Sequence, residues 1–222
     1  MRTPRALVVL ATATVAAALA IACRPAHAAA PGHPPTTRDT TTLLWTVAID
    51  ETCKAVHSVD RLANAGFCRA HLVTRPNARA AAAGGTSALA ELAAAAGASH
   101  ASDAAREIWR ALRLLRRDGG DEGRAATGPG AVWRRALERC GTLYGAVRAR
   151  YEAARDAVAE GRYGDVATEL GGVPAIAQLC EAGFLGPGSS SRPPHWLEDY
   201  EVFNTQFAHL AVAITSLIKD KE

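Results

Sequence analysis

The 222-residue sequence lacks the short motifs that mark common hydrolases, zinc proteases and nucleotide-binding enzymes. It has no G-x-S-x-G, no H-E-x-x-H, no phosphate-binding loop and no G-x-G-x-x-G. Cysteine and histidine are not paired at metal-ligand spacing either, since neither C-x-x-C nor H-x-x-x-H occurs. These absences argue against catalysis, and we expect no enzyme activity, no metal site and no cofactor.

Long apolar runs are also missing, except at the N-terminus. Arg2 and Arg5 precede an uncharged, Ala-, Leu- and Val-rich run over residues 6–23, and Ala26-His27-Ala28 follows it. A charged start, an apolar stretch and a small-x-small site are typical of a secretory signal peptide. We therefore expect residues 1–28 to be removed; the alternative is an uncleaved membrane anchor.

Without the predicted signal peptide, the chain has no excess of positive or negative charge. Cleavage after Ala28 would take Lys+Arg from 25 to 22 by removing three arginines, against an unchanged 22 Asp+Glu. The mature chain is then formally neutral, which gives no argument for a nucleic-acid partner. We expect a secreted, extracellular protein without a membrane segment, and a disordered leader over the Pro-, Thr- and Ala-rich residues 29–41.

What the sequence does contain is helical periodicity. Apolar residues recur at alternating steps of three and four in three successive segments, the pattern of helices with one buried seam. The seams begin at Trp133, at Tyr163 after a break at Gly161, and at Tyr200. Such helices joined by short links are typical of an antiparallel bundle. We predict an all-α fold, an up-down four-helix bundle over residues 86–219 preceded by a helical hairpin over residues 42–75.

Two of the bundle helices contain residues that disfavour helix. In the Ala-rich segment 86–116, Gly97 and the stretch Ser99–Ser102 interrupt the pattern, which predicts a helix broken in its middle. Gly171, Gly172 and Pro174 interrupt the third bundle helix. Because proline removes a backbone donor and clashes with the preceding turn, we expect a kink there, or a split between Leu170 and Val173.

The four cysteines left after cleavage test this layout. In an antiparallel hairpin, bridged residues lie at similar distances from the turn. Cys140 and Cys180 average to position 160, beside Gly161, and Cys53 and Cys68 bracket a hairpin centred near Asp60. Of the three possible pairings we predict these two local ones, which stabilise the fold by about 4 and about 3 kcal/mol in the chain-entropy model.

Several short elements then resemble one known family. They are Glu51-Thr52-Cys53-Lys54, Gly66-Phe67-Cys68, Cys140 with Leu143-Tyr144, Gly161-Arg162-Tyr163, Cys180-Glu181-Ala182-Gly183-Phe184 and the closing Leu210–Ile214. Together they are similar to the plant pectin methylesterase inhibitor and invertase inhibitor family, over about residues 43–218. The resemblance implies the bundle with its hairpin, the same two bridges, and a function by binding. The partner it implies is a cell-wall pectin methylesterase or an acid invertase, in a one-to-one complex in the plant apoplast.

Two cues on the target oppose each other. The Pro-Lys-Phe tripeptide associated with many invertase inhibitors is absent, whereas the long spacing between Cys53 and Cys68 and the Gly-Phe-Cys ending resemble other members assigned as invertase inhibitors. Two other classes remain open. A secreted helical signalling ligand would also be a disulfide-closed bundle, and a lipid carrier would need a hollow core, against which the large seam side chains argue.

Charge along the chain suggests a contact surface. Residues 163–201 hold six acidic residues and the single base Arg192. The ordinary explanation is a solvated face. The alternative explanation is that the third and fourth bundle helices form an acidic surface that contacts the partner. Asp165, Glu169 and Glu181 are the candidate contacts on this surface. Five histidines are candidates for pH sensing, with solvated positions as the alternative: His57, His71, His100, His195 and His209.

Overall fold

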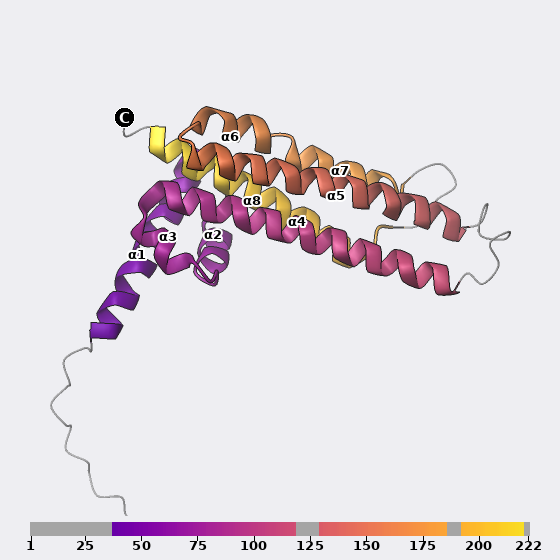
Figure 1. The fold of residues 1–222 in the computed structure, drawn as a ribbon, viewed down its shortest axis with the longest axis horizontal. Helices are drawn as coiled ribbons and strands as arrows, with labels where there is room; N and C mark the ends of the chain where they lie inside the picture. The colour runs from indigo at the N-terminus through magenta and orange to yellow at the C-terminus, as the bar shows by residue number, and fades with distance from the viewer. Residues whose placement is uncertain (1–36, 119–128, 186–191, 220–222) are drawn as a thin grey trace, which may run out of the picture. The chain divides into compact units, whose positions relative to one another are not determined.

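A computed structural model describes residues 37–118, 129–185 and 192–219, and all regular secondary structure within these ranges is helical (Figure 1). Residues 1–36, which include the predicted signal peptide and most of the predicted leader, lie outside the described residues. The helices are α1 (Thr37–Val59), α2 (Ala65–Leu72), α3 (Ala78–Ala83), α4 (Gly85–Asp118), α5 (Pro129–Ala159), α6 (Tyr163–Leu170), α7 (Val173–Ala182) and α8 (His195–Lys219). No helix among these has an apolar stretch that would cross a membrane.

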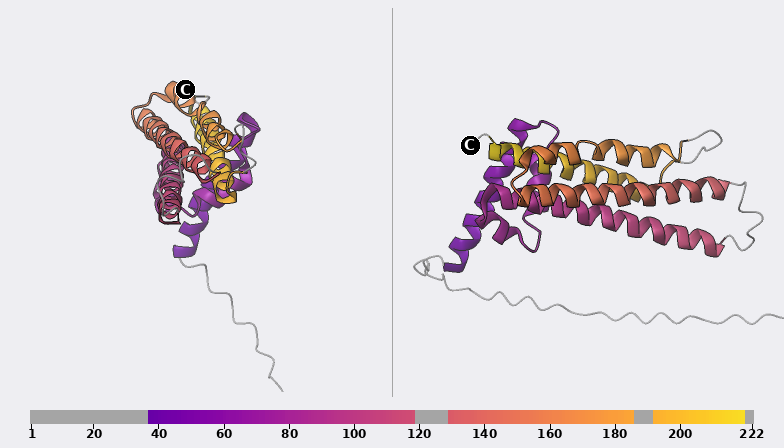
Figure 2. Two further views of the ribbon diagram at one scale, coloured as in Figure 1. Left: turned by 90° about the vertical axis from the view of Figure 1, so that its right-hand side faces the viewer. Right: turned by 45° about the horizontal axis from the view of Figure 1, so that its top comes forward.

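The predicted four-helix bundle is confirmed. Helices α4, α5 and α8 and the α6–α7 pair run side by side along one axis, and α4 packs against both α5 and α8 (Figures 1 and 2). The predicted seams point inward and fill the core with large side chains at 0–1% exposure, which stabilise the fold by leaving water: Ile108, Leu112, Leu137, Tyr144, Tyr151, Leu170 and Phe207.

Helix α4 is continuous through Gly97, so the predicted break in its middle is wrong. A Cβ atom at Gly97 would lie 2.2 Å from Cε1 of Tyr151, a residue of α5. The glycine therefore makes room for a buried ring from the neighbouring helix. Ser102 is accommodated by its own helix, because its Oγ donates to the carbonyl of Ala98 at 2.9 Å.

The third bundle helix is split as predicted. Helix α6 ends at Leu170 and α7 begins at Val173, with Pro174 in the first turn of α7. Proline is tolerated there because the first turn of a helix has no intrahelical partner for its N–H groups. The two short helices still continue along the same side of the bundle (Figure 1).

The N-terminal hairpin consists of α1 and α2. Helix α1 begins at Thr37, so residues 37–41 are helical where the leader was expected to be disordered. The last helix-breaking prolines of that segment are Pro34 and Pro35, and the composition that favours disorder ends with them. Helix α3 lies between the hairpin and α4 and was not anticipated. Its six residues are too few to show a period.

Both disulfides form as predicted. Cys53 joins Cys68 across the hairpin with Cα atoms 5.6 Å apart, and Cys140 joins Cys180 across α5 and α7 with Cα atoms 4.7 Å apart. The turn between α1 and α2 is fastened to α8, because His209 Nδ1 lies 2.8 Å from an oxygen of Asp60 and Gln206 donates to the carbonyl of Leu62. The hairpin and α3 therefore gather at the end of the bundle where α8 finishes (Figure 2).

Candidate docking surface

Helix α6 presents two of the three candidate contacts. Asp165 and Glu169 lie one turn apart, and their side chains are 55% and 37% exposed. Asp165 pairs with Arg162, which precedes the helix. An oxygen of Glu169 lies 3.9 Å from Nη1 of Arg150 on α5, and the same nitrogen donates to the carbonyl of Glu169 at 3.2 Å. The acidic surface of α6 is thus held in place by arginines yet open to solvent.

Glu181, the third candidate, lies on α7 and is near acidic residues of α8. It belongs to α7, and at 1.5 Å per residue it is roughly 18 Å along the axis from Glu169. Its Oε1 is buried and accepts no hydrogen bond from the described part of the chain. Burial, and then Glu201 and Glu198 of α8, raise the pKa of the Glu181 carboxyl to about 7. The neighbouring acid Glu201 can bond to it only when one of the two is protonated.

Tyr144 belongs to the same interior cluster. Its hydroxyl is buried in α5 without a hydrogen-bond partner among the described residues. Burial raises the pKa of this hydroxyl, and the charges of Glu201 and Glu181 raise it further. The structure therefore separates the three acids, with Asp165 and Glu169 on the surface of α6 and Glu181 turned toward α8. Charge counting along the sequence found Glu201 as one of six acids, but nothing in the sequence paired it with Glu181.

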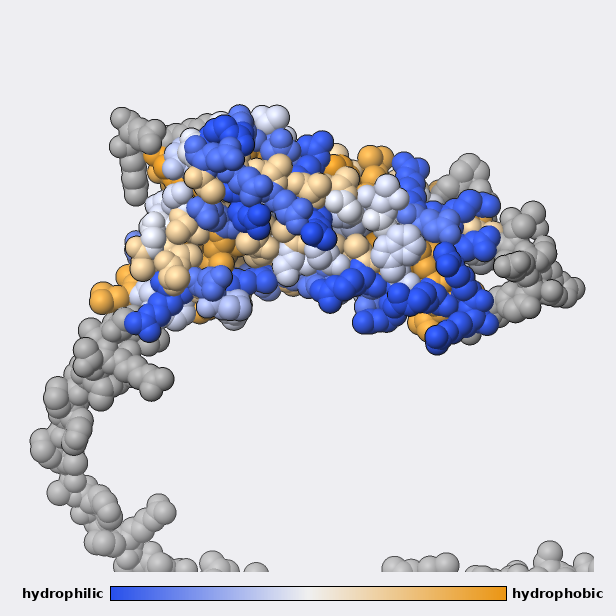
Figure 3. Space-filling model, in the orientation of Figure 1, coloured by the Kyte–Doolittle hydropathy of each residue, from blue (hydrophilic) through white to orange (hydrophobic). Residues whose placement is uncertain are grey.

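On the face that Figure 3 shows, hydrophilic side chains gather over the C-terminal half of α4. Some large apolar side chains are exposed, among them Leu43, Leu44 and Val47 near the start of α1. Trp109 on α4 is 46% exposed, and Trp133 is partly buried with its ring edge-to-face on Phe184 at 5.3 Å.

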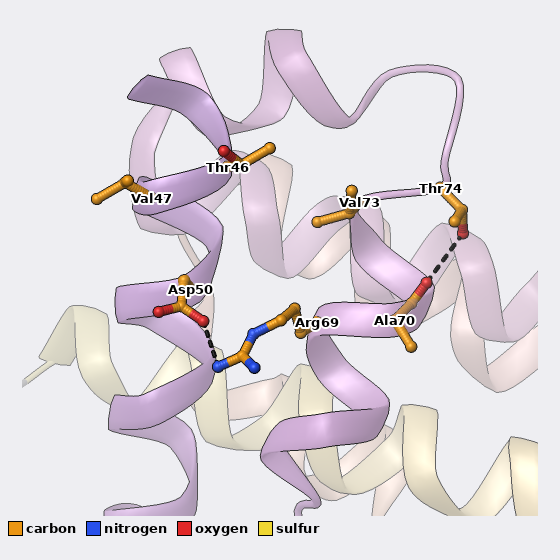
Figure 4. Close-up of a pocket in the computed structure, with 7 residues that line it drawn as sticks. All are labelled: Thr46, Val47, Asp50, Arg69, Ala70, Val73 and Thr74. Atoms are coloured by element: carbon orange, nitrogen blue, oxygen red, sulfur yellow. Dashed lines mark hydrogen bonds and ion pairs between the residues drawn. The ribbon is translucent and has the colours of Figure 1, made fainter. Parts of the chain in front are cut away.

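A groove of about 540 Å³ separates α1 from α2. Asp50 and Arg69 form an ion pair across it, and Val47 and Val73 supply apolar walls (Figure 4). Leu43 and Leu44, which lie N-terminal to the groove on α1, are more than 60% exposed. The groove belongs to the hairpin and lies apart from the acidic surface of α6.

Metal ligation finds no support in this geometry. Across residues 37–118, 129–185 and 192–219, no three His, Cys, Asp or Glu side chains lie close enough together to hold an ion. His195 pairs with Glu198 and His209 with Asp60, each as a single contact.

The class defined by these features is a two-disulfide helical bundle with an N-terminal helical hairpin. The chain belongs to the plant invertase/pectin methylesterase inhibitor family, whose model matches residues 47–215. The match begins inside α1 and ends inside α8, so it includes both bridges and nearly all of the bundle. A search of curated proteins finds no match to this chain.

Proposed function

We propose that the mature, oxidised protein is a secreted inhibitor that binds a pectin methylesterase or an acid invertase one-to-one and blocks its substrate cleft. The observation that carries the proposal is the family match over residues 47–215, which includes all four bridged cysteines, together with the two bridges themselves. A rigid, disulfide-closed bundle suits this task, since preformed surfaces lose little conformational entropy on binding. The place of action is the plant cell wall, where such enzymes meet a secreted protein.

The acidic surface of α6 is the first contact we propose. Asp165 and Glu169 are exposed, one turn apart and fixed by Arg162 and Arg150. A carboxylate pair held in this way favours a basic patch on the partner and loses strength as salt is added. Glu181 is left out of this surface, because it lies on α7 and its Oε1 is buried beside the acids of α8.

The proposal is tested by titrating the protein against a panel of plant pectin methylesterases and cell-wall and vacuolar invertases at mildly acidic pH. We expect one enzyme class to lose activity, with the endpoint at one equivalent. A sample whose two bridges have been reduced and alkylated serves as the control and should inhibit less. If no panel member is inhibited by oxidised protein of verified helicity, the proposed function is refuted.

The contact is tested by the double charge reversal Asp165→Lys and Glu169→Lys. Inhibition should weaken by about tenfold or more, since the introduced lysines would face the partner's basic patch, and like charges at an interface cost several kcal/mol. The matched control is Glu51→Lys on α1, where the carboxylate is likewise exposed and ion-paired. Circular dichroism should show unchanged helicity in both variants. Equal loss of inhibition in the control would remove α6 from the contact.

A further inference from the structure

A second recess lies on the bundle, between α4 and α8. It has a volume of about 270 Å³ and is lined by His100, Trp196, Asp199, Tyr200 and Phe203. Sites for drug-sized molecules usually measure about 300–1,000 Å³, so this pocket suits a single side chain better than a whole ligand. Three of its walls are aromatic rings from successive turns of one helix face.

The rings are held in place by their neighbours. His100 of α4 stacks on Phe203 with ring centroids 5.0 Å apart and planes inclined by 25°. Trp196 meets Tyr200 edge-to-face at 6.4 Å. Each of the three aromatic residues of α8 is partly buried against the core, so the pocket is preformed. A preformed pocket binds without the cost of ordering its walls.

The charge at the pocket is unbalanced. Asp199 is exposed at the lining and makes no hydrogen bond or ion pair with any residue of the described ranges. The arginines of α4 that act on Tyr200 are each neutralised along their own helix, Arg106 by Asp103 and Arg110 by Glu107. Arg75 acts on His100 at the back of the pocket, but its guanidinium lies over the Phe207 ring, which is not part of the lining. The unpaired charge among the lining residues is therefore the Asp199 carboxylate, beside three aromatic rings.

This combination selects a cation. Aromatic rings carry negative charge on their faces and attract a guanidinium or ammonium group within about 6 Å, and a carboxylate adds a charged hydrogen bond. An apolar side chain would fill the same space but leave Asp199 without a partner, whereas a neutral sugar could donate hydroxyl hydrogen bonds to Asp199 but would bring no charge for the ring faces to attract. An anion would meet the carboxylate directly and be repelled.

We propose that this pocket binds a basic side chain, arginine or lysine, presented by a protein partner. Trp196, Tyr200 and Phe203 line the space that the cation occupies, and Asp199 forms an ion pair with it. Only the identity of the partner, the enzyme that the protein inhibits, rests on the proposed function. The chemistry of the pocket is independent of that identity.

The test uses a small probe and the whole oxidised protein. N-acetyl-arginine amide is titrated at pH 6 and followed by calorimetry and by the indole N–H resonances, with N-acetyl-citrulline amide as an uncharged probe of the same shape. We expect saturable binding of the arginine probe that shifts the Trp196 resonance, and binding of the citrulline probe at least tenfold weaker. Equal binding of both probes, or no binding of either, overturns the proposal.

Variants locate the site. Asp199→Asn and Trp196→Ala should each weaken binding of the arginine probe by about tenfold or more. Asp156→Asn and Trp109→Ala are the matched controls, since they alter an exposed carboxylate and an exposed indole away from the pocket. An unchanged affinity in Asp199→Asn, which alters no packing, overturns the assignment.

The two proposals fail separately. Inhibition of an enzyme by a protein that does not bind the probe would refute the pocket and leave the proposed function intact. Binding of the probe by a protein that inhibits no enzyme would refute the function and leave the pocket. Where both hold, Asp199→Asn should also reduce inhibition while Asp156→Asn does not.

Discussion

At the scale of single residues, the structure places one base and one acid where their charged forms are disfavoured. His100 lies between α4 and α8, where burial, and then the charges of Arg75 and His71, lower the pKa of its imidazole from 6.5 to about 4. Glu181 faces Glu201 and Glu198 with its pKa raised to about 7. Protonation of His100 destabilises the folded protein, whereas protonation of Glu181 stabilises it. The two groups therefore have opposite effects on stability between pH 4 and 7.

The first prediction concerns His100. Its folded pKa lies below the unfolded value, so its contribution to stability is complete above about pH 6.5 and is lost as pH falls through about 4. Protonation would place a third positive charge beside Arg75 and His71 in a cluster with Phe203 and Phe207. The variant His100→Phe should therefore show a smaller loss of melting temperature between pH 7 and 4 than the natural protein.

The measured quantity for His100 is the change of melting temperature with pH. A loss or gain of stability that is the same at every pH does not affect this quantity. His195→Phe is the control, because that side chain is 96% exposed. The same slope in the natural protein and in His100→Phe would show that this imidazole is not the group that titrates.

The second prediction concerns Glu181 and has the opposite sign. Its folded pKa lies above the unfolded value of 4.5, so its contribution is complete below about pH 4.5 and is lost as pH rises through about 7. Glu181→Gln should raise the melting temperature at pH 7.5 more than at pH 4.5, because it removes a repelled charge. Glu51→Gln on α1 is the control. A gain for Glu181→Gln that does not depend on pH would contradict the assignment.

At the scale of helices, a glycine acts through what packs against it. Gly97 and Gly145 both lie inside bundle helices, so helix propensity alone predicts that alanine stabilises each of them. Their surroundings differ. A Cβ atom at Gly97 would meet the Tyr151 ring, whereas one at Gly145 would meet nothing within 4 Å.

The third prediction compares these two glycines. Gly97→Ala should lower the free energy of unfolding by about 1–3 kcal/mol, because the buried Tyr151 ring must move, and its hydroxyl donates to the carbonyl of Asn204. Gly145→Ala should raise it by about 0.5–1 kcal/mol. Urea unfolding measures both. Stabilisation of similar size in the two variants would mean that Tyr151 does not press on α4.

The same glycine shows where sequence reasoning stopped. The seams, both bridges and the split at Pro174 were predictable because each depends on residues near one another in sequence or on a simple distance from a turn. Gly97 was interpreted as a break because its partner Tyr151 is far along the chain. The inward position of Glu181 was missed for the same reason, since it depends on Glu201 across the α7–α8 contact. Local patterns indicate which residues are helical, and long-range packing decides which polar groups stay on the surface.

At the scale of the whole molecule, the hairpin and the bundle are each stabilised by a disulfide of their own. Cys53–Cys68 closes the hairpin, Cys140–Cys180 closes the bundle, and contacts such as His209 with Asp60 join the two. The surfaces that we propose for binding, the acidic surface of α6 and the aromatic pocket between α4 and α8, both belong to the bundle. The groove between α1 and α2 is on the hairpin, so the two parts can be distinguished by where a partner binds.

The central claim is that the protein acts by binding an enzyme through its bundle. Hydrogen–deuterium exchange of the oxidised protein, alone and with each panel enzyme, tests it most directly. We expect exchange to slow in α6 and in the first half of α8 with one class of enzyme, while α1 is unchanged. Exchange that is unchanged with every enzyme, or that slows only in the α1–α2 hairpin, would contradict the claim.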